Sequence, residues 1–530
     1  MTAMPALAAA APGTIGHVSA VEGSRIVGIL EETAEAVRLG GFVAIAAGGA
    51  TVFGVIAAMR TRGAMRAGDK AGGTMDIELI GEIAAGSAGF QRGVSVHPGL
   101  GAAIRAAGRD DLAAIYAPPT VASVVLGALS HDPDQPAYVR TDDLLGKHFA
   151  VLGTTGSGKS CTVTLILKRI LKEYPHGHVV LLDPHNEYAA AFGGQAEVVD
   201  PANLSLPYWL LNFTEALATF VSPDGPTRDF EAAILREAIL AAKRDSVLWR
   251  GKRNEAITVD SPVPYDLDDV ATAIDKRKGR LDQPEGSVPY LRLENRIAAL
   301  RADERLKFMF APAAATLSLT DILSRILRIP VAGRPLTIVD LSGVPAEIVD
   351  VVVAVVSRML FDFAVWSANE ATAPLLLVCE EAHRYVSADE QARGAPARTA
   401  IARIANEGRK YGVSLGLVTQ RPSQLSASIL SQCNTLFALR MANAHDQEYV
   451  RRAMPEGWAS LVAGLPALRS QEAVVVGEGV AMPMRLRFAD LDPAEQPRSQ
   501  TAPFAALWSA DTLDRGFIES TVHRWRHQTR

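Results

Sequence analysis

The sequence predicts an α/β protein whose mostly parallel sheet is preceded by a small β-barrel and interrupted by a helical insertion. Three observations lead to this prediction. Residues 13–130 contain short β-prone runs separated by glycine-rich turns. Further on, short apolar runs alternate with helix-favouring stretches, as in a parallel sheet covered on both faces. Residues 221–325 lack such runs and are rich in charged, helix-favouring residues.

The composition is that of an ordinary globular protein. The 530 residues, 48% hydrophobic and 21% charged, exceed what one core usually supports, so we expect more than one domain. The formal net charge of -5 excludes the overall positive field of a small DNA-coating protein, and any nucleic-acid contact must come from a local basic surface. Three scattered cysteines are too few for a disulfide framework or a zinc site, and a reducing cytoplasm fits them.

We assign residues 1–130 to the β-barrel. Residues 42–45 and 51–56 are β-prone and flank Gly48 and Gly49, so they predict a hairpin with a Gly-Gly turn. The uncharged stretch around this hairpin is as long as a membrane-crossing helix, but it is largely alanine and glycine, so we expect no membrane span. The N-terminus lacks the basic lead of a cleaved signal.

The parallel-sheet domain is predicted over residues 140–220 and 326–500, after a polar, proline-containing connector at residues 132–136. Its predicted strands are the apolar runs 148–152, 178–182, 336–339, 375–378 and 414–418. Such runs, bounded by turn signals, are typical of strands buried on both faces.

Two helical segments complete the predicted organisation. The insertion, residues 221–325, carries basic clusters at 250–253 and 276–280, but interspersed acidic residues favour a solvated helical face over a phosphate-binding one. The tail, residues 501–530, predicts an amphipathic helix that docks either on its own domain or on a neighbouring subunit. The apolar side of this helix consists of Phe517, Ile518, Val522 and Trp525.

Residues 153–160 match the phosphate-binding loop G-x-x-x-x-G-K-S/T at every fixed position and lie between an apolar strand and a helical run. In such a loop, glycines let successive backbone N–H groups converge on the β-phosphate, and the helix N-terminus adds its positive dipole. Lys159 is expected to reach the β- and γ-phosphates of ATP, and the Ser160 hydroxyl to bind Mg²⁺. The predicted nucleotide-binding residues are Gly153, Thr155, Gly156, Ser157, Gly158, Lys159, Ser160 and Cys161.

A phosphate loop of this kind needs acidic side chains at the end of another strand. Glu380 and Glu381 directly follow a buried apolar run. One carboxylate should hold the hydration shell of Mg²⁺ and the other should polarise the attacking water. Their order favours Glu380 for the metal and Glu381 as the catalytic base, and an exchange of these roles stays open. Glutamate at the metal position departs from the aspartate that is usual there.

Three further polar segments are candidates for the same site. Gln420 follows the next apolar run and is predicted to hydrogen-bond the nucleophilic water, with a turn-capping amide as the alternative. Arg409 could stabilise the γ-phosphate of a neighbouring subunit's nucleotide, because guanidinium suits bidentate phosphate contact; a surface salt bridge is the alternative. Residues 183–188, Asp-Pro-His-Asn-Glu-Tyr, look like metal ligands, but we favour a role in shaping the nucleotide site.

In combination these motifs resemble the HerA family of hexameric ATPases, relatives of the FtsK-type DNA pumps. The matching stretches of the core are residues 153–160, 182–188, 207–209, 338–343, 375–385, 406–412 and 419–434. Near the N-terminus, residues 81–83, 90–94 and 97–101 are similar to the barrel of that family. The resemblance covers most of the chain and weakens in the helical insertion and the C-terminal tail.

The resemblance implies a RecA/FtsK-like P-loop ATPase that forms a cytoplasmic homohexamer, with ATP between subunits and double-stranded DNA in the central channel. It also implies a partner nuclease or other effector, NurA-like, sirtuin-like or of another kind, in DNA-end processing or anti-phage defence. By the same likeness Arg409 is the arginine finger, and Arg140 is a weaker trans-acting candidate. The sequence shows no nuclease or sirtuin-like motif, so any cutting belongs to the partner.

Two other functions stay open beside a DNA translocase. One is an ATPase scaffold that assembles and gates a defence effector without moving DNA. The other is a conjugation- or secretion-type ATPase, which would need a membrane anchor and is disfavoured by the predicted hairpin. Stimulation of the ATPase by DNA would separate the translocase from the scaffold.

Overall fold

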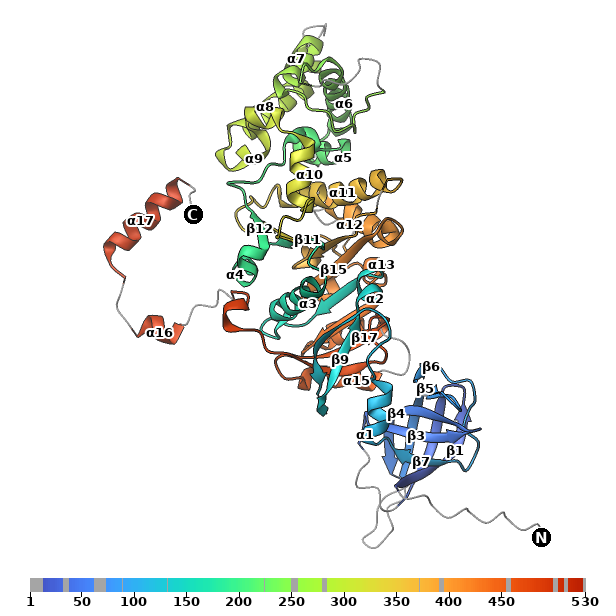
Figure 1. The fold of residues 1–530 in the computed structure, drawn as a ribbon. Coiled ribbons are helices and arrows are strands. Elements are labelled where there is room, and N and C mark those ends of the chain that lie inside the picture. Colours follow the sequence, from blue (N-terminus) through green and yellow to red (C-terminus); the bar gives the residue numbers. More distant parts are fainter. Residues whose placement is uncertain are drawn as a thin grey trace, which may run out of the picture. The chain divides into compact units, whose positions relative to one another are not determined.

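The structure is a computed structural model (Figure 1). It describes residues 13–31, 38–61, 73–87, 89–130, 132–223, 225–248, 256–278, 284–370, 372–389, 395–453, 459–498, 504–509 and 513–527. The chain divides into two compact units. The first comprises Met1–Glu173 and Gly416–Asp490, and the second comprises Tyr174–Leu415 and Leu491–Arg530.

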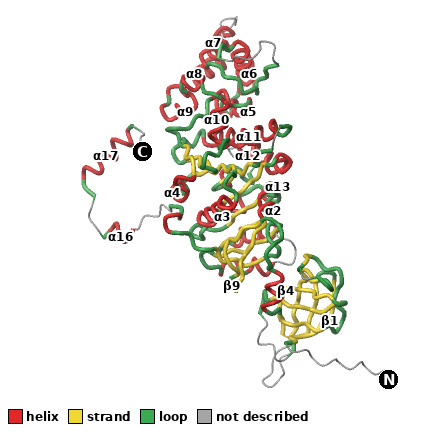
Figure 2. Tube along the Cα trace, in the orientation of Figure 1, coloured by secondary structure: helices red, strands yellow, loops and turns green. Residues whose placement is uncertain are grey.

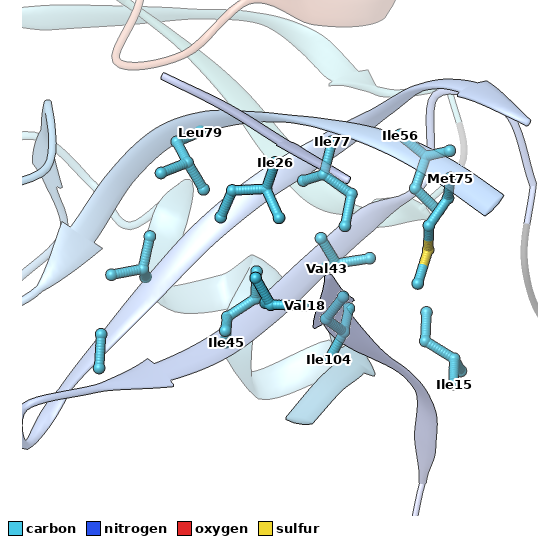
Figure 3. Close-up of a cluster of buried hydrophobic side chains, with 12 residues drawn as sticks. Ile15, Val18, Ile26, Val43, Ile45, Ile56, Met75, Ile77, Leu79 and Ile104 are labelled. Atoms are coloured by element: carbon cyan, nitrogen blue, oxygen red, sulfur yellow. The ribbon is translucent and has the colours of Figure 1, made fainter. Parts of the chain in front are cut away.

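The first unit begins with an antiparallel β-barrel. Its described strands are β1 (Thr14–Glu22), β2 (Arg25–Leu30), β3 (Phe42–Ala47), β4 (Ala50–Thr61), β5 (Gly73–Ile83), β6 (Gln91–Arg92) and β7 (Ala103–Ala106). They follow the order β2-β1-β7-β3-β4-β5-β6, and a second pairing between β2 and β5 closes the sheet. Alternate side chains point inward, so that Ile26, Val43, Ile77 and Ile104 meet in a fully buried core (Figure 3).

The predicted hairpin is confirmed. Strands β3 and β4 pair with Ala47 opposite Ala50, so Gly48 and Gly49 alone make the turn. Their φ values of 55° and 89° lie in the left-handed region that a two-residue turn of this type requires and that glycine adopts without strain. No helix in the described part of the chain combines the length and the apolar character needed to cross a membrane.

The boundary expected at residue 130 needs correction. After α1 (Arg109–Ile115), strand β8 (Ser123–Leu129) pairs with β9 (Asp132–Arg140) and with β18 (Met484–Phe488), so it belongs to a second sheet and not to the barrel. The polar connector expected at residues 132–136 is the start of β9. Strand β9 lies at the edge of its sheet. Pro133 and Pro136 have no backbone N–H to donate, and an edge strand tolerates this because one of its sides pairs with no other strand.

The second sheet of the first unit contains the strand that leads into the phosphate loop. Strand β10 (Phe149–Leu152) lies parallel to β15 (Val413–Thr419) on one side and to β16 (Thr435–Leu439) on the other. Antiparallel pairings then continue from β16 through β17 (Glu472–Gly477) to β18, β8 and β9. Its helices are α2 (Thr141–Leu145), α3 (Lys159–Glu173), α13 (Ala427–Leu430), α14 (Ala444–Ala453) and α15 (Ala459–Ala463).

The second unit contains a parallel sheet of the order β12-β13-β11-β14. These strands are β11 (His178–Asp183), β12 (Ala196–Val199), β13 (Leu336–Asp340) and β14 (Leu375–Cys379). Helices α4 (Ala189–Phe192), α11 (Val349–Ser367) and α12 (Ala395–Glu407) belong to this unit, and α11 packs against α12. All five apolar runs predicted as strands are therefore confirmed, as β10, β11, β13, β14 and β15.

The insertion is helical, as expected. Helix α5 (Phe213–Phe220) ends just before it. Helices α6 (Arg228–Asp245), α7 (Leu267–Lys278), α8 (Val288–Ala302) and α9 (Lys307–Phe310) lie within it, α10 (Leu319–Leu327) crosses its end, and no strand occurs among its described residues (Figure 2). In the basic cluster of α7, Lys278 donates to Glu294 at 2.8 Å, which favours the expected solvated helical face over a phosphate contact. The other cluster, residues 250–253, lies outside the described residues.

The tail contains α16 (Phe504–Trp508) and α17 (Arg515–Arg526). The predicted amphipathic helix is thus present, and Phe517, Ile518 and Trp525 on its apolar side are exposed.

Candidate nucleotide site

The phosphate loop connects β10 to α3 and is fixed by the strands on either side of β10. The backbone N–H of Gly153 donates to the carbonyl of Thr419 at 3.2 Å, at the end of β15. The backbone N–H and the hydroxyl of Thr154 both donate to the carbonyl of Arg440 at 3.0 Å, just past β16. Because these parallel strands end at the same edge of the sheet, the loop is held at their carboxyl ends, where α/β proteins bind ligands.

Each glycine of the loop meets a separate requirement. A Cβ on Gly153 would lie 2.6 Å from Ser157 Oγ and 2.8 Å from Leu439 Cβ, so the strand end has no room for a side chain. Gly156 and Gly158 have φ values of 74° and 98°, which other residues rarely adopt. These conformations bend the loop so that α3 begins at once at Lys159, and the positive end of the helix dipole lies at the loop.

The side chains of the loop are also suited to an anion. Lys159 is only 8% exposed, and its ammonium donates to the carbonyl of Thr154 at 3.4 Å, beyond the usual length of such a bond. Ser157 is fully buried, and its hydroxyl has no hydrogen-bond partner among the described residues. Ser160 and Cys161, which forms no disulfide, follow in the first turn of α3. A buried ammonium with one long hydrogen bond at the N-terminus of a helix is an environment suited to phosphate.

Gln420 is brought to this loop by the fold. It directly follows β15, and its amide oxygen accepts a hydrogen bond from the hydroxyl of Thr155. The sequence separation is 265 residues, so only the pairing of β10 with β15 makes this contact. The first unit thus carries the predicted phosphate loop together with Gln420.

The two glutamates lie at the end of β14 in the second unit. The backbone N–H of Glu380 donates to the carbonyl of Leu182 in β11 at 3.2 Å, and the side chain is 3% exposed. Glu381 has a left-handed backbone with φ of 50°, which turns the chain out of the strand into the 3₁₀ helix η6 (Ala382–Arg384). The imidazole Nδ1 of His383 lies 3.2 Å from Glu381 Oε2. Sequence reasoning did not assign His383 to the site, although its place two residues after Glu381 was a signal.

Residues 183–188 form a turn that the side chain of Asp183 holds. The carboxylate of Asp183 accepts the backbone N–H groups of His185 at 3.1 Å and Tyr188 at 3.0 Å, so its oxygens hold the turn. The hydroxyl of Tyr188 donates to Glu380 Oε2 at 2.5 Å. No group of three or more metal-ligating side chains occurs in the described part of the chain. Burial raises the pKa of Asp183 and holds the pKa of Tyr188 well above its ordinary value.

The two predicted arginines lie in different units. Arg409 belongs to the second, in the 3₁₀ helix η7 (Gly408–Tyr411), where its side chain is exposed and pairs with no other described residue. Arg140 belongs to the first, immediately before α2, with Nη1 3.7 Å from an oxygen of Asp143. Burial and the charge of Arg140 together lower the pKa of Arg92.

Residues 124–360 match the family model described as the central domain of the helicase HerA. The chain is 26% identical to the probable DNA double-strand break repair helicase HerA of Methanocaldococcus jannaschii over 396 residues. This alignment covers 67% of this chain and 74% of that protein. It is 28% identical over 401 residues to the DNA double-strand break repair helicase HerA of Pyrococcus furiosus, covering 69% of each. Among solved structures, VirB4 of Thermoanaerobacter pseudethanolicus shares the fold, with a TM-score of 0.51 and 17% identity over 71% of this chain and 98% of that chain.

Proposed function

We infer that this chain, whose residues 124–360 match the model of the central domain of the helicase HerA, is an ATPase motor that moves double-stranded DNA as a homohexameric ring. The phosphate loop carries the inference. It has the backbone geometry, the buried ammonium of Lys159 and the neighbouring amide of Gln420 that hydrolysis of a nucleoside triphosphate needs. The action on DNA rests on the relatives, which are named as DNA double-strand break repair helicases.

We assign each predicted residue a role in ATP hydrolysis. The N–H groups of the loop and Lys159 bind the phosphates, and Gln420 orients the water that attacks the γ-phosphate. Glu381 accepts the proton of that water, while His383 beside it limits the directions its carboxylate can take. Arg409, exposed and without a partner among the described residues, reaches the nucleotide of a neighbouring subunit.

A magnesium ion fits the side chains that the chain offers. The hydroxyl of Ser160 would be one ligand, and the carboxylate of Glu380 would hold the ion through its water shell. When bound, the ion neutralises charge that develops on the phosphate oxygens. Oxygen ligands of this kind are those that Mg²⁺ prefers.

The motor acts with a partner in our proposal. Neither a nuclease nor a sirtuin-like motif is present in the sequence, so a NurA-like nuclease or another effector would supply cutting in DNA-end processing or anti-phage defence. None of the three cysteines forms a disulfide, which agrees with work in a reducing cytoplasm. With a net charge of -5, the chain would contact the DNA backbone through a local basic surface of the ring.

The test is the rate of ATP hydrolysis by the purified protein with and without linear duplex DNA, run beside light scattering to measure particle mass. Strong stimulation in a particle of six subunits is the expected result, and Lys159→Ala is the inactive control. Displacement of a third strand from a DNA triplex then reports translocation. A ring whose hydrolysis ignores DNA would replace the motor by an ATPase scaffold, and absence of hydrolysis would refute the assignment altogether.

A further inference from the structure

A side-chain hydrogen bond joins the turn after β11 to the first residue after β14. Tyr188 is 0% exposed and Glu380 is 3% exposed, and the phenol oxygen lies 2.5 Å from Glu380 Oε2. The phenol hydroxyl donates this bond and the carboxylate oxygen accepts it. A short bond to an ionised group in a buried setting is among the stronger hydrogen bonds in proteins.

The backbone fixes the donor of this bond in place. The backbone N–H of Tyr188 donates to the carboxylate of Asp183 at 3.0 Å, and the carbonyl of Tyr188 accepts a hydrogen bond from the N–H of Ala191 at 3.0 Å. Asn186 between them has a left-handed φ of 54°, which closes the turn. Hydrogen bonds on both sides of Tyr188 therefore fix the backbone of the turn from which the phenol reaches Glu380.

A glutamate at this position has a particular need for such a donor. Compared with aspartate, its carboxylate stands on one more methylene and has one more rotatable bond, so its oxygens sample more positions. A hydrogen bond to one carboxylate oxygen restricts that last torsion. Partners of this kind, which orient a ligand without touching the metal, commonly change metal affinity or activity about 10- to 100-fold when they are removed.

We propose that Tyr188 is a positioning residue that holds the carboxylate of Glu380 in the orientation needed to bind hydrated Mg²⁺ with the nucleotide. The proposal rests on the proposed ATPase function and assigns the segment 183–188 its role: Asp183 builds the turn, and Tyr188 orients the acidic side chain on the next strand. Binding of the nucleotide itself, through the phosphate loop, does not depend on Tyr188.

The test is Tyr188→Phe, which removes the hydroxyl and keeps the ring. A fluorescent ADP analogue is titrated onto the full chain in EDTA and then with increasing Mg²⁺. We expect unchanged affinity in EDTA and an increase of about tenfold or more in the Mg²⁺ concentration needed for half of the metal effect. The matched control is Tyr208→Phe, because Tyr208 is equally buried and donates to the carbonyl of Tyr265 at 2.7 Å. This control should lose a hydrogen bond without changing the Mg²⁺ requirement.

The outcomes separate the inference from the function it rests on. An unchanged Mg²⁺ requirement in Tyr188→Phe, or an equal loss of affinity with and without Mg²⁺, would overturn the positioning role. Absence of any metal effect in the wild-type protein would instead refute the ATPase assignment. If Tyr188→Phe does not fold, Tyr188→Met is measured in its place, because it also removes the hydroxyl and its flexible apolar side chain adapts to the space; a wild-type Mg²⁺ requirement in that variant overturns the proposal. In Glu380→Gln, adding Tyr188→Phe should change nothing further.

Discussion

Replacing Lys159 by methionine is expected to stabilise the nucleotide-free protein while removing nucleotide binding. The ammonium is 8% exposed, and its hydrogen bond to Thr154 is long, at 3.4 Å, so desolvation is poorly compensated. Replacing buried charges by apolar side chains of similar volume often stabilises a protein, and we expect a gain of about 1–2 kcal/mol here. For a domain of this size, that gain raises the midpoint of thermal unfolding by roughly 2–8 °C.

The expected loss of nucleotide-binding free energy is larger than this gain in the free energy of unfolding. In the proposed complex Lys159 makes two charge-assisted hydrogen bonds to phosphate, each worth about 1.5–3 kcal/mol. Their sum corresponds to an affinity about 10²- to 10⁴-fold weaker. Lys172 is the control, because it is exposed in the last turn of the same helix, and Lys172→Met should change neither quantity.

The assays are thermal unfolding without nucleotide and titration of a fluorescent ADP analogue. The reasoning is refuted if Lys159→Met unfolds at a lower temperature than the wild type, since the ammonium would then be a structural partner of the loop. It is equally refuted if the variant binds the analogue as the wild type does.

Three further changes test other parts of the argument. Glu381→Gln should bind ATP normally but hydrolyse it about 10²- to 10⁴-fold more slowly in a steady-state assay, because the general base is lost; loss of binding would contradict that role. Arg409→Ala should lower the activity of mixed rings more than in proportion to its share, whereas a proportional loss would argue against a finger acting on the neighbouring subunit. Burial lowers the pKa of Lys243 to about 8. Above that pH the unfolded chain binds more protons than the folded one, because its lysine keeps an ordinary pKa. The contribution of Lys243 to the free energy of unfolding therefore rises by about 2 kcal/mol from pH 7.5 to 9.5. That rise, measured by chemical denaturation, should be missing in Lys243→Met, and equal pH dependence in both proteins would refute it.

Much of the fold could be predicted because its signals are local. The strands of the parallel sheets are continuous apolar runs, and the β3–β4 turn needs two adjacent residues with positive φ, which Gly48 and Gly49 supply. Strand β9 was missed because its polar, proline-containing start resembles a connector. Only its position at the edge of the sheet makes such a sequence acceptable in a strand.

The sequence by itself determined the phosphate loop, since a run of eight residues carries the glycines, the lysine and the helix start that the backbone geometry requires. It also determined that acidic and amide side chains follow buried strands. Only the tertiary structure decided their partners: Gln420 meets Thr155 across 265 residues, and Tyr188 meets Glu380 across 192. The physical reason is that a hydrogen bond between two strand ends depends on which strands lie next to each other. Strand order is fixed by the packing of the whole sheet, so it cannot be predicted from the residues that flank the contact.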